Sequence, residues 1–575
     1  MNCGPNELVK VGTMRVRKSL LRILSVVAVA AILVLGIVAV RRFTGLGTYY
    51  KAVGAMIKYG VDLNDPKPFV KLQLGKTAFG LACSGGGSRA AYLTAAILRE
   101  IHRTHVRADI DNNHTGDLVN QLDIVSSVSG GSLAAVYLVA NIEQLENANA
   151  DDRPWQDYVD KMAFSYRPAQ WYRIRPFSWL KFVFTNYNRG LMARDDYDEK
   201  LFHERTIADL PDRPALYLNA FDVGNHVRFV FSRHFIDTYY YQPSWAGNAL
   251  SAPQDFTSEN DLAYSDVDPG SVRLADGAYA SSAYPIFYPN LAINNYGQKI
   301  LFKGRLIFLA DGGLADNSGL LTLFTQMKAA IDDDAKKGIL PLAVYVDASE
   351  DWVGRSGSPF QESGIEDEYA WHNTWYRQGE QTIDAAITIH QDAVFQFLAS
   401  TGVFGLPGFP DSLAANYPGL RARPETTQAS RAVSPKAVWG ELMNSGKLAV
   451  RPCVIPLGLR DIVDAYYNIW AESEFGKSPE DPRLLELLER SGIQNYKAAW
   501  TDGPSSSLNG QLVKHVRGIP TDFALGQSDR ATLDLVAYIL VHGELENALA
   551  EWSSVARDAL AQQGSKSPPP NQGKP

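Results

Sequence analysis

The sequence is poor in cysteine: only Cys3, Cys83 and Cys453 occur in 575 residues. Three cysteines are too few for a disulfide framework. No CxxC pair or other zinc-type spacing is present, so we expect no structural metal. We interpret Cys83 as a small buried residue on a strand rather than as a redox centre.

The sequence also lacks nucleotide-binding loops and an excess of positive charge. Its formal net charge is -8, which gives no indication of nucleic acid binding. It contains no GxxxxGK[ST] loop and no GxGxxG followed about 20 positions later by an acidic residue, so neither a P-loop nor a dinucleotide fold is expected. An apolar content of 46% and a charged content of 21% are typical of a globular protein.

One long apolar run lies near the N-terminus. Residues 23–40 contain no charge and as a helix would span about 27 Å, close to the hydrocarbon thickness of about 30 Å. We therefore expect a single-pass transmembrane helix that enters the lipid bilayer. A cleaved signal peptide is disfavoured because no A-x-A-type site follows the run. The flanking basic residues nearly balance, and their small excess before residue 23 favours the rest of the chain on the non-cytoplasmic side.

The chain divides into six predicted parts. They are a basic segment (1–22), the transmembrane helix (23–40), a juxtamembrane linker (41–76), an α/β domain (77–350) with an insertion at about 150–210, a C-terminal extension (351–563) and a disordered tail (564–575). The insertion is rich in aromatic and basic side chains over 154–187. We interpret it as a helical subdomain packed by aromatics, with a membrane-interfacial lid as the alternative.

Segments typical of strands and helices alternate in the α/β domain. We expect strands at 77–83, within 119–126, and at 214–220, 227–232, 306–310 and 342–346, and helices at 90–102, 133–145 and 319–331. Such alternation, with turns at the strand ends, is typical of a parallel sheet. Further helices are expected at 478–490 and 528–563.

Two glycine-rich turns follow predicted strands. The first, Ser84-Gly85-Gly86-Gly87-Ser88-Arg89, offers backbone N–H groups for an oxyanion. The second, Ser127-Val128-Ser129-Gly130-Gly131, resembles a nucleophile elbow, in which a strained strand-to-helix turn holds a serine. Ser129 is therefore the predicted nucleophile, and the predicted oxyanion-hole donors are Gly85, Gly86, Gly87 and Gly130.

The predicted base is Asp311, which ends a predicted strand and precedes two glycines. No histidine after Ser129 lies in a recognisable catalytic turn. A carboxylate with an ordinary pKa of about 3.9 is a weak base, but burial beside the serine would raise its basicity. Asp276-Gly277-Ala278 offers a second aspartate turn, and we prefer Asp311 because an apolar strand precedes it.

In this order the motifs resemble those of the patatin-like phospholipase family. SGGGSRA is similar to the family's glycine-rich loop, SVSGG to its GxSxG elbow, and DGG at 311–313 to its aspartate motif. ASSAYP at 280–285 is similar to a loop that the family carries upstream of this aspartate. The glycine loop is also similar to that of group IV cytosolic phospholipases. Ser127 and Ala90 stand where the family has glycine.

The resemblance implies a three-layer α/β/α fold and hydrolysis of lipid acyl esters by a Ser129–Asp311 dyad, with no metal or cofactor. Membrane lipids are the expected substrate, and the chain's oligomeric state is left open. We interpret Arg89 as an anchor of the glycine loop, with contact to a lipid phosphate as the alternative. Two other functions stay open, namely a catalytically silent membrane scaffold and a transacylase that uses the same residues.

Overall fold

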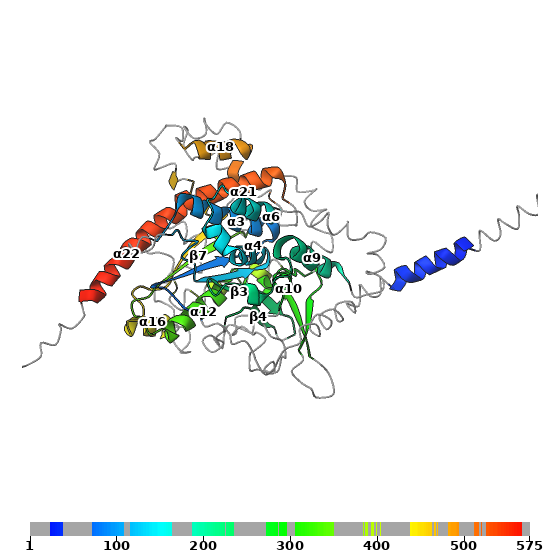
Figure 1. Cartoon of the computed structure of the whole chain (residues 1–575), viewed down its shortest axis with the longest axis horizontal. Helices are drawn as coiled ribbons and strands as arrows, with labels where there is room; N and C mark the ends of the chain where they lie inside the picture. The colour runs from blue at the N-terminus through cyan, green and yellow to red at the C-terminus, as the bar shows by residue number, and fades with distance from the viewer. Residues whose placement is uncertain are drawn as a thin grey trace, which may run out of the picture.

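The structure is a computed structural model with a central sheet and helices on both of its faces (Figure 1). It describes residues 23–37, 72–108, 116–163, 187–224, 226–234, 272–285, 287–295, 305–349, 437–459, 481–493 and 525–565, with separate positions within 383–403, 461–469 and 511–519. The described body is thus a three-layer α/β/α arrangement, as the sequence predicts.

Eight strands form one sheet in the order β5-β6-β3-β2-β1-β7-β8, with β4 paired to β3 beside this path. The strands are β1 (Thr77–Cys83), β2 (Ile124–Val128), β3 (Ala215–Asp222), β4 (Val227–Phe231), β5 (Leu291–Asn295), β6 (Arg305–Asp311), β7 (Leu340–Asp347) and β8 (Cys453–Gly458). All six strands expected from the sequence are present.

The sheet is mixed, which corrects the prediction of a parallel sheet. Strands β3, β2, β1, β7 and β8 run parallel to one another. Strand β4 is antiparallel to β3, and β6 is antiparallel to both β3 and β5. The connection from Asp222 to Val227 is too short for a crossover, so β4 must run back along β3.

The main helices and helical turns of the α/β body lie before, between and after these strands. They are α3 (Gly87–Thr104), α4 (Ser129–Ala140), α5 (Ile142–Glu146), α6 (Arg153–Met162), α9 (Arg189–Tyr197), the π-helical turn η1 (Asp198–Phe202), the 3-10 turn η2 (Ile207–Asp209), α10 (Leu274–Ser281), α11 (Gly313–Asp316), α12 (Leu320–Asp333), α16 (Ala437–Asn444), α18 (Pro482–Arg490), α21 (Gln527–Leu540), the π-helical turn η7 (Val541–Leu545) and α22 (Glu546–Ser565).

Alternate residues of each strand enter two separate cores, because successive side chains of a strand point to opposite faces. Phe79 and Leu81 of β1 belong to the core beneath α3, α4 and α21. Ala78 and Ala82 of the same strand belong to the core beneath α12 and α16. The near-continuous apolar character of β1 follows from burial on both faces.

The predicted domain boundary at residue 350 falls inside the sheet. Strand β8 pairs in parallel with β7 along Leu342–Asp347, so the segment after 350 supplies a strand of the same sheet. Helix α21 covers α3, and the Tyr92 hydroxyl donates a hydrogen bond to Asp534 Oδ1 over 3.0 Å. The C-terminal extension is therefore a structural part of the α/β body and not a separate appendage.

Several helix boundaries differ from the predicted ones. The predicted helix at 133–145 begins earlier, as α4, and continues as α5 after a break at Asn141. The predicted helix at 478–490 is described from Pro482, after the Asp481 side chain accepts the Arg483 N–H as a cap. Within the insertion, α6 buries Trp155 and Tyr158 completely, which supports the packed interpretation there. Residues 164–186 lie outside the described residues, and so do 41–71 and the last ten residues.

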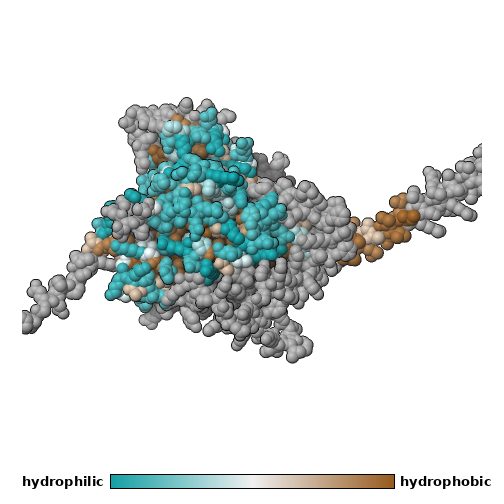
Figure 2. Space-filling view, viewed as in Figure 1, coloured by the Kyte–Doolittle hydropathy of each residue, from teal (hydrophilic) through white to brown (hydrophobic). Residues whose placement is uncertain are grey.

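Near the N-terminus, residues 23–37 are helical and hydrophobic on their surface (Figure 2). Among the residues that the structure describes, no helix is both long and apolar enough to cross a membrane. Residues 38–40 lie outside that part of the chain, and the transmembrane helix over 23–40 stays a prediction.

Candidate active site

Strand β3 places the two predicted catalytic residues side by side. Val128, the last residue of β2, pairs with Asn219 of β3. Asp311, the last residue of β6, pairs with the next residue, Ala220. Strand β4 pairs with the other edge of β3 at these positions, so β2 and β6 both lie along the same edge of β3. The C-terminal ends of β2 and β6 therefore meet there. Ser129, which follows Val128, therefore lies next to Asp311 although 182 residues separate them in sequence.

Ser129 has the strained backbone of a nucleophile elbow. Its φ is 50°, in the left-handed region that non-glycine residues rarely adopt. Glycines make the sharp turn possible: a Cβ on Gly130 would lie 1.9 Å from the Gly87 carbonyl oxygen, and one on Gly131 would lie 2.5 Å from the Ser84 carbonyl oxygen. The elbow and the glycine loop thus approach each other backbone to backbone.

The Ser129 hydroxyl donates a hydrogen bond to Asp311 Oδ2 over 2.7 Å. Ser129 is 8% exposed and Asp311 is 2% exposed. The other carboxylate oxygen, Oδ1, accepts the Gly313 N–H over 2.8 Å. Burial raises the pKa of Asp311 to about 6, against the hydrogen bonds from Ser129 and Gly313, which lower it. The carboxylate is consequently a stronger base than an ordinary aspartate and is still ionised at neutral pH.

The N-termini of α3 and α4 present backbone N–H groups beside Ser129. Gly86 has a φ of 138° and Gly87 a φ of 58°, which only glycine adopts readily. Within the described part of the chain, no hydrogen-bond acceptor is found for the N–H groups of Gly86, Gly87 and Gly130. The first N–H groups of a helix have no partner within the helix, so these three are available to an anion.

Gly85 differs from the other predicted oxyanion donors. Its N–H already donates to the Asn317 carbonyl oxygen over 3.0 Å. A Cβ at this position would lie 2.1 Å from Asn317 Oδ1 and 3.2 Å from Ser129 Cβ. Gly85 therefore makes room for the Asn317 side chain and for Ser129, and it supplies no free donor.

Residues 81–324 match the family model described as patatin-like phospholipase. The chain contains a patatin-like phospholipase domain. The matched range begins in β1, ends in α12 and includes both glycine turns, Ser129 and Asp311. The family resemblance of the sequence motifs is thereby confirmed, and lipid acyl hydrolysis is the general activity that such a domain supports. No curated protein matches the chain in sequence.

Arg89 anchors the glycine loop of the patatin-like domain from inside. Its side chain is 2% exposed and donates to the carbonyl oxygens of Ala348, over 2.7 Å, and Ile519, over 3.3 Å. These contacts tie the start of α3 to the end of β7 and to the C-terminal part of the chain. They support the structural interpretation of Arg89 rather than contact with a lipid phosphate.

Asp276, in the second aspartate turn, lies on α10, and its Oδ1 forms an ion pair with Arg194 of α9 over 3.2 Å. Its turn is part of a helix, whereas Asp311 is the last residue of a strand. The structure therefore brings Asp311, and not Asp276, to Ser129.

The sequence predicts no role for three residues that contribute to the site, Asn219, Asn317 and Ser281, although Ser281 lies in the ASSAYP segment at 280–285. Asn219 donates from Nδ2 to Ser126 Oγ and to the Ser127 carbonyl oxygen, each over 3.0 Å. It is the one amide in an otherwise apolar predicted strand, a signal that could have found it. Asn317 and Ser281 reach the site through tertiary packing: the Asn317 carbonyl oxygen accepts the Gly85 N–H and Ser281 Oγ accepts the Ser129 N–H. The ASSAYP segment indicates the neighbourhood of Ser281 but not this contact.

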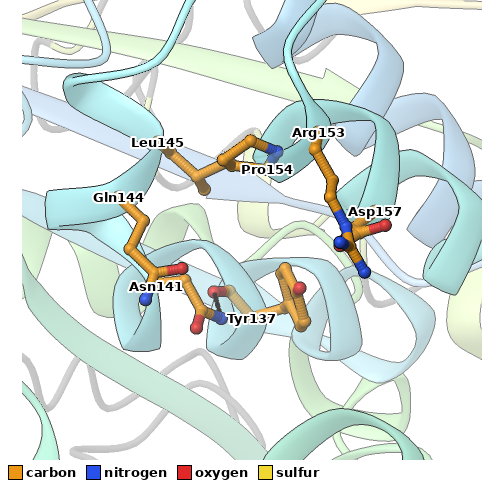
Figure 3. A pocket seen from close by; sticks show the side chains of 7 residues that line it. All are labelled: Tyr137, Asn141, Gln144, Leu145, Arg153, Pro154 and Asp157. Carbon is orange, nitrogen blue, oxygen red and sulfur yellow. Dashed lines mark hydrogen bonds and ion pairs between the residues drawn. The ribbon is translucent and has the colours of Figure 1, made fainter.

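A small cavity lies at the opposite end of α4 from Ser129 (Figure 3). Its volume is about 250 Å³, and it is lined by Tyr137, Asn141, Gln144, Leu145, Arg153, Pro154 and Asp157. It contains none of the predicted catalytic residues. In the described part of the patatin-like domain and its C-terminal extension, no group of three or more His, Cys, Asp or Glu side chains is placed to hold a metal ion.

Proposed function

We propose that this protein is a membrane-attached serine hydrolase of lipid acyl esters, with Ser129 as nucleophile and Asp311 as general base. The observation that carries the proposal is the 2.7 Å hydrogen bond from the Ser129 hydroxyl to the buried Asp311 carboxylate. A serine on a strained elbow and a carboxylate of raised pKa form the two parts that nucleophilic acyl transfer requires.

The reaction proceeds in two acyl transfers. Ser129 Oγ attacks the ester carbonyl carbon while its proton passes to Asp311 Oδ2. Asp311 then returns the proton to the departing alcohol oxygen, which leaves an acyl group on Ser129. Water attacks this acyl group, gives its proton to Asp311, and releases the fatty acid as Ser129 regains its hydrogen.

The negative charge on the tetrahedral carbonyl oxygen needs donors outside the Ser129–Asp311 pair. We assign this role to the N–H groups of Gly86, Gly87 and Gly130, at the start of two helices whose dipoles favour an anion. Gly85 is left out of the oxyanion hole because its N–H is bonded to Asn317.

The test is hydrolysis of phospholipid vesicles and of a short-chain ester by purified protein. Ser129→Ala and Asp311→Asn are expected to lower kcat by at least about 1000-fold, because catalytic residues that act as a unit fail together. The matched control is Asp276→Asn, which removes the aspartate of the second turn and should leave kcat within about threefold. Full activity of Asp311→Asn would overturn the assignment of the base.

The same preparation separates the alternative functions. A fluorophosphonate probe should label wild-type protein and leave Ser129→Ala unlabelled, whereas a silent scaffold leaves both unlabelled. Adding an alcohol acceptor distinguishes a transacylase, whose acylated product would grow at the expense of free fatty acid.

Membrane attachment through residues 23–40 is part of the proposal. Nine large apolar side chains of the described helix 23–37 are more than half exposed to solvent, and they are Ile23, Leu24, Val26, Val27, Val29, Ile32, Leu33, Leu35 and Ile37. Burying such a surface in lipid is favourable by about 25 cal/mol per Å². Flotation with vesicles is expected for the full chain and not for a chain that begins at residue 72. Equal flotation of both would contradict the proposal.

A further inference from the structure

The backbone N–H of Ser129 has its hydrogen-bond partner outside its own helix. Ser129 is the first residue of α4, so this N–H has no acceptor within the helix. It instead donates to Ser281 Oγ over 3.0 Å. An elbow residue with a φ of 50° persists only when its surroundings hold it in place, and this hydrogen bond is one such restraint.

The Ser281 hydroxyl connects the elbow to strand β3. Ser281 ends helix α10 and is completely buried. Its hydroxyl donates to the Asn219 carbonyl oxygen over 2.6 Å while its oxygen accepts the Ser129 N–H. Ser132 Oγ, one turn along α4, lies 2.8 Å from the same oxygen. Ser281 thus links the backbone of Ser129 to β3, the strand that also pairs with Asp311.

The same segment holds the base. The Ser281 carbonyl oxygen accepts the Gly312 N–H over 3.1 Å, and the Ala283 carbonyl oxygen accepts the Asp311 N–H over 3.1 Å. One residue therefore restrains Ser129 through its side chain and the aspartate turn through its backbone. Replacing the side chain removes the first restraint and keeps the second.

We infer that Ser281 is a positioning residue of the hydrolase: its hydroxyl fixes the backbone of Ser129 so that Oγ stays within hydrogen-bond distance of Asp311. This inference rests on the proposed function. The Ser129 N–H is already bonded to Ser281 and is not available to the oxyanion. The oxyanion is therefore assigned to glycine N–H groups.

The adjacent serine provides a matched control. Ser282 is also buried, and its hydroxyl donates to the Ala278 carbonyl oxygen over 2.8 Å, within α10 and its end. Both Ser281→Ala and Ser282→Ala remove one buried hydroxyl from the same turn. Only the first removes a partner of Ser129, so a general loss of packing affects both variants and a positioning role affects one.

The experiment measures kcat and KM for a short-chain ester, thermal unfolding, and hydrogen exchange of overlapping peptides that resolve the Ser129 amide, all on the full chain. Ser281→Ala is expected to lower kcat about 10- to 100-fold with KM changed less than about threefold, as expected for lost alignment of the reacting groups. The Ser129 amide should exchange at least about tenfold faster. Ser282→Ala should leave kcat, KM and this amide near wild type. The Ser281→Cys side chain is of similar size and is a weak acceptor, so the kcat and the exchange rate of this variant should lie between those of the two alanine variants. Ser281→Cys provides the test where Ser281→Ala fails to fold.

Two results would overturn the inference: equal losses of kcat in the Ser281→Ala and Ser282→Ala variants, or unchanged exchange of the Ser129 amide in Ser281→Ala. Failure of the proposed function gives a different pattern. In that case wild-type protein shows no turnover above Ser129→Ala, and the exchange rate of the Ser129 amide alone decides whether Ser281 holds it.

Discussion

At Asp311, burial and hydrogen bonding act on the pKa in opposite directions, and burial prevails. The carboxylate keeps two donors, the Ser129 hydroxyl and the Gly313 N–H, yet its pKa rises to about 6 because it is removed from water. A base in this range is deprotonated at neutral pH and still accepts a proton readily. In the proposed mechanism, desolvation thus gives the Asp311 carboxylate a pKa close to that of the histidine in a Ser-His-Asp triad.

This pKa predicts the pH dependence of hydrolysis. The active form has Asp311 ionised, so kcat/KM should be constant above about pH 7 and should fall tenfold per pH unit below about 6. The measurement is a pH profile with a neutral short-chain ester, corrected for the rate of Ser129→Ala at each pH. An acid limb centred near pH 4 would show that the working carboxylate is an ordinary exposed one.

Gly130 meets the tightest backbone contact of the site. A Cβ there would lie 1.9 Å from the Gly87 carbonyl oxygen and 2.6 Å from the Gly87 carbonyl carbon, and neither atom can rotate away. Gly130→Ala is expected to lower kcat more than about 100-fold and to cost about 1–3 kcal/mol of stability, measured by ester turnover and urea unfolding.

Gly440 on α16 is the control for this substitution, because a Cβ there meets nothing within 4 Å. Gly440→Ala should leave turnover unchanged and alter stability by less than about 1 kcal/mol in the favourable direction. Comparable losses in both variants would mean that the contact between Gly130 and Gly87 is not what the site depends on.

The sequence reveals those site residues whose environment is local. Ser129 and Asp311 are predictable because Ser129 directly follows β2, Asp311 ends β6, and each is followed by two glycines. The hydrogen bond from Gly85 to Asn317 spans 232 residues and the one from Ser129 to Ser281 spans 152. Such pairs depend on tertiary packing, so no spacing rule could have excluded Gly85. The ASSAYP motif at 280–285 includes Ser281, but its spacing does not reveal that this hydroxyl contacts Ser129.

Among elements, strand positions are well predicted and strand directions are not. The apolar run before Asp311 indicates a strand, and β6 is that strand. Its antiparallel direction follows from its pairing with β3 and β5, which periodicity does not encode. This direction is what brings the C-terminal end of β6 against the C-terminal end of β2, and the site depends on it.

Helices α3 and η7 are joined by a cluster of buried charges around Glu100. Glu100 is 2% exposed; its Oε2 accepts Arg483 over 2.6 Å and Arg103 over 3.1 Å. His542 lies 3.5 Å from Oε1 of Glu100 and 3.4 Å from Glu546. Burial alone would lower the pKa of His542, but the two carboxylates outweigh it and raise the pKa to about 9.

A raised histidine pKa predicts a stability change at alkaline pH. Because the folded protein binds this proton more tightly than the unfolded chain, the stabilisation is complete below about pH 6.5 and is lost as pH rises through about 9. Allowing for solvent screening, we expect about 1–2 kcal/mol. His542→Gln should be less stable than wild type at pH 6.5 and nearly equal to it at pH 10 in urea unfolding. A constant difference between the two proteins across this range would contradict the assignment.

At the scale of the whole molecule, the folded α/β body extends further along the chain than the patatin-like match. The match ends at residue 324, within α12, but β7 and β8 extend the sheet beyond it and α21 covers α3. The sequence predicts the α21 and α22 helices correctly and does not predict β8, a short apolar run at Cys453–Gly458. Its place at the sheet edge is visible only from its pairing with β7.

This arrangement predicts where the chain can be shortened. A chain of residues 72–349 lacks β8 and α21, so it exposes the edge of β7 and the apolar face of α3. Residues such as Leu457 and Val536 are completely buried in the same core as Leu81, and removing them leaves a core that cannot close. We expect residues 72–349 to show no cooperative thermal unfolding and no ester hydrolysis, whereas residues 72–565 should unfold cooperatively and retain hydrolysis of a soluble short-chain ester. Circular dichroism melts and turnover of both chains provide the comparison. A cooperative, active 72–349 chain would restore the boundary at 350 and would mean that β8 and α21 only decorate a complete domain.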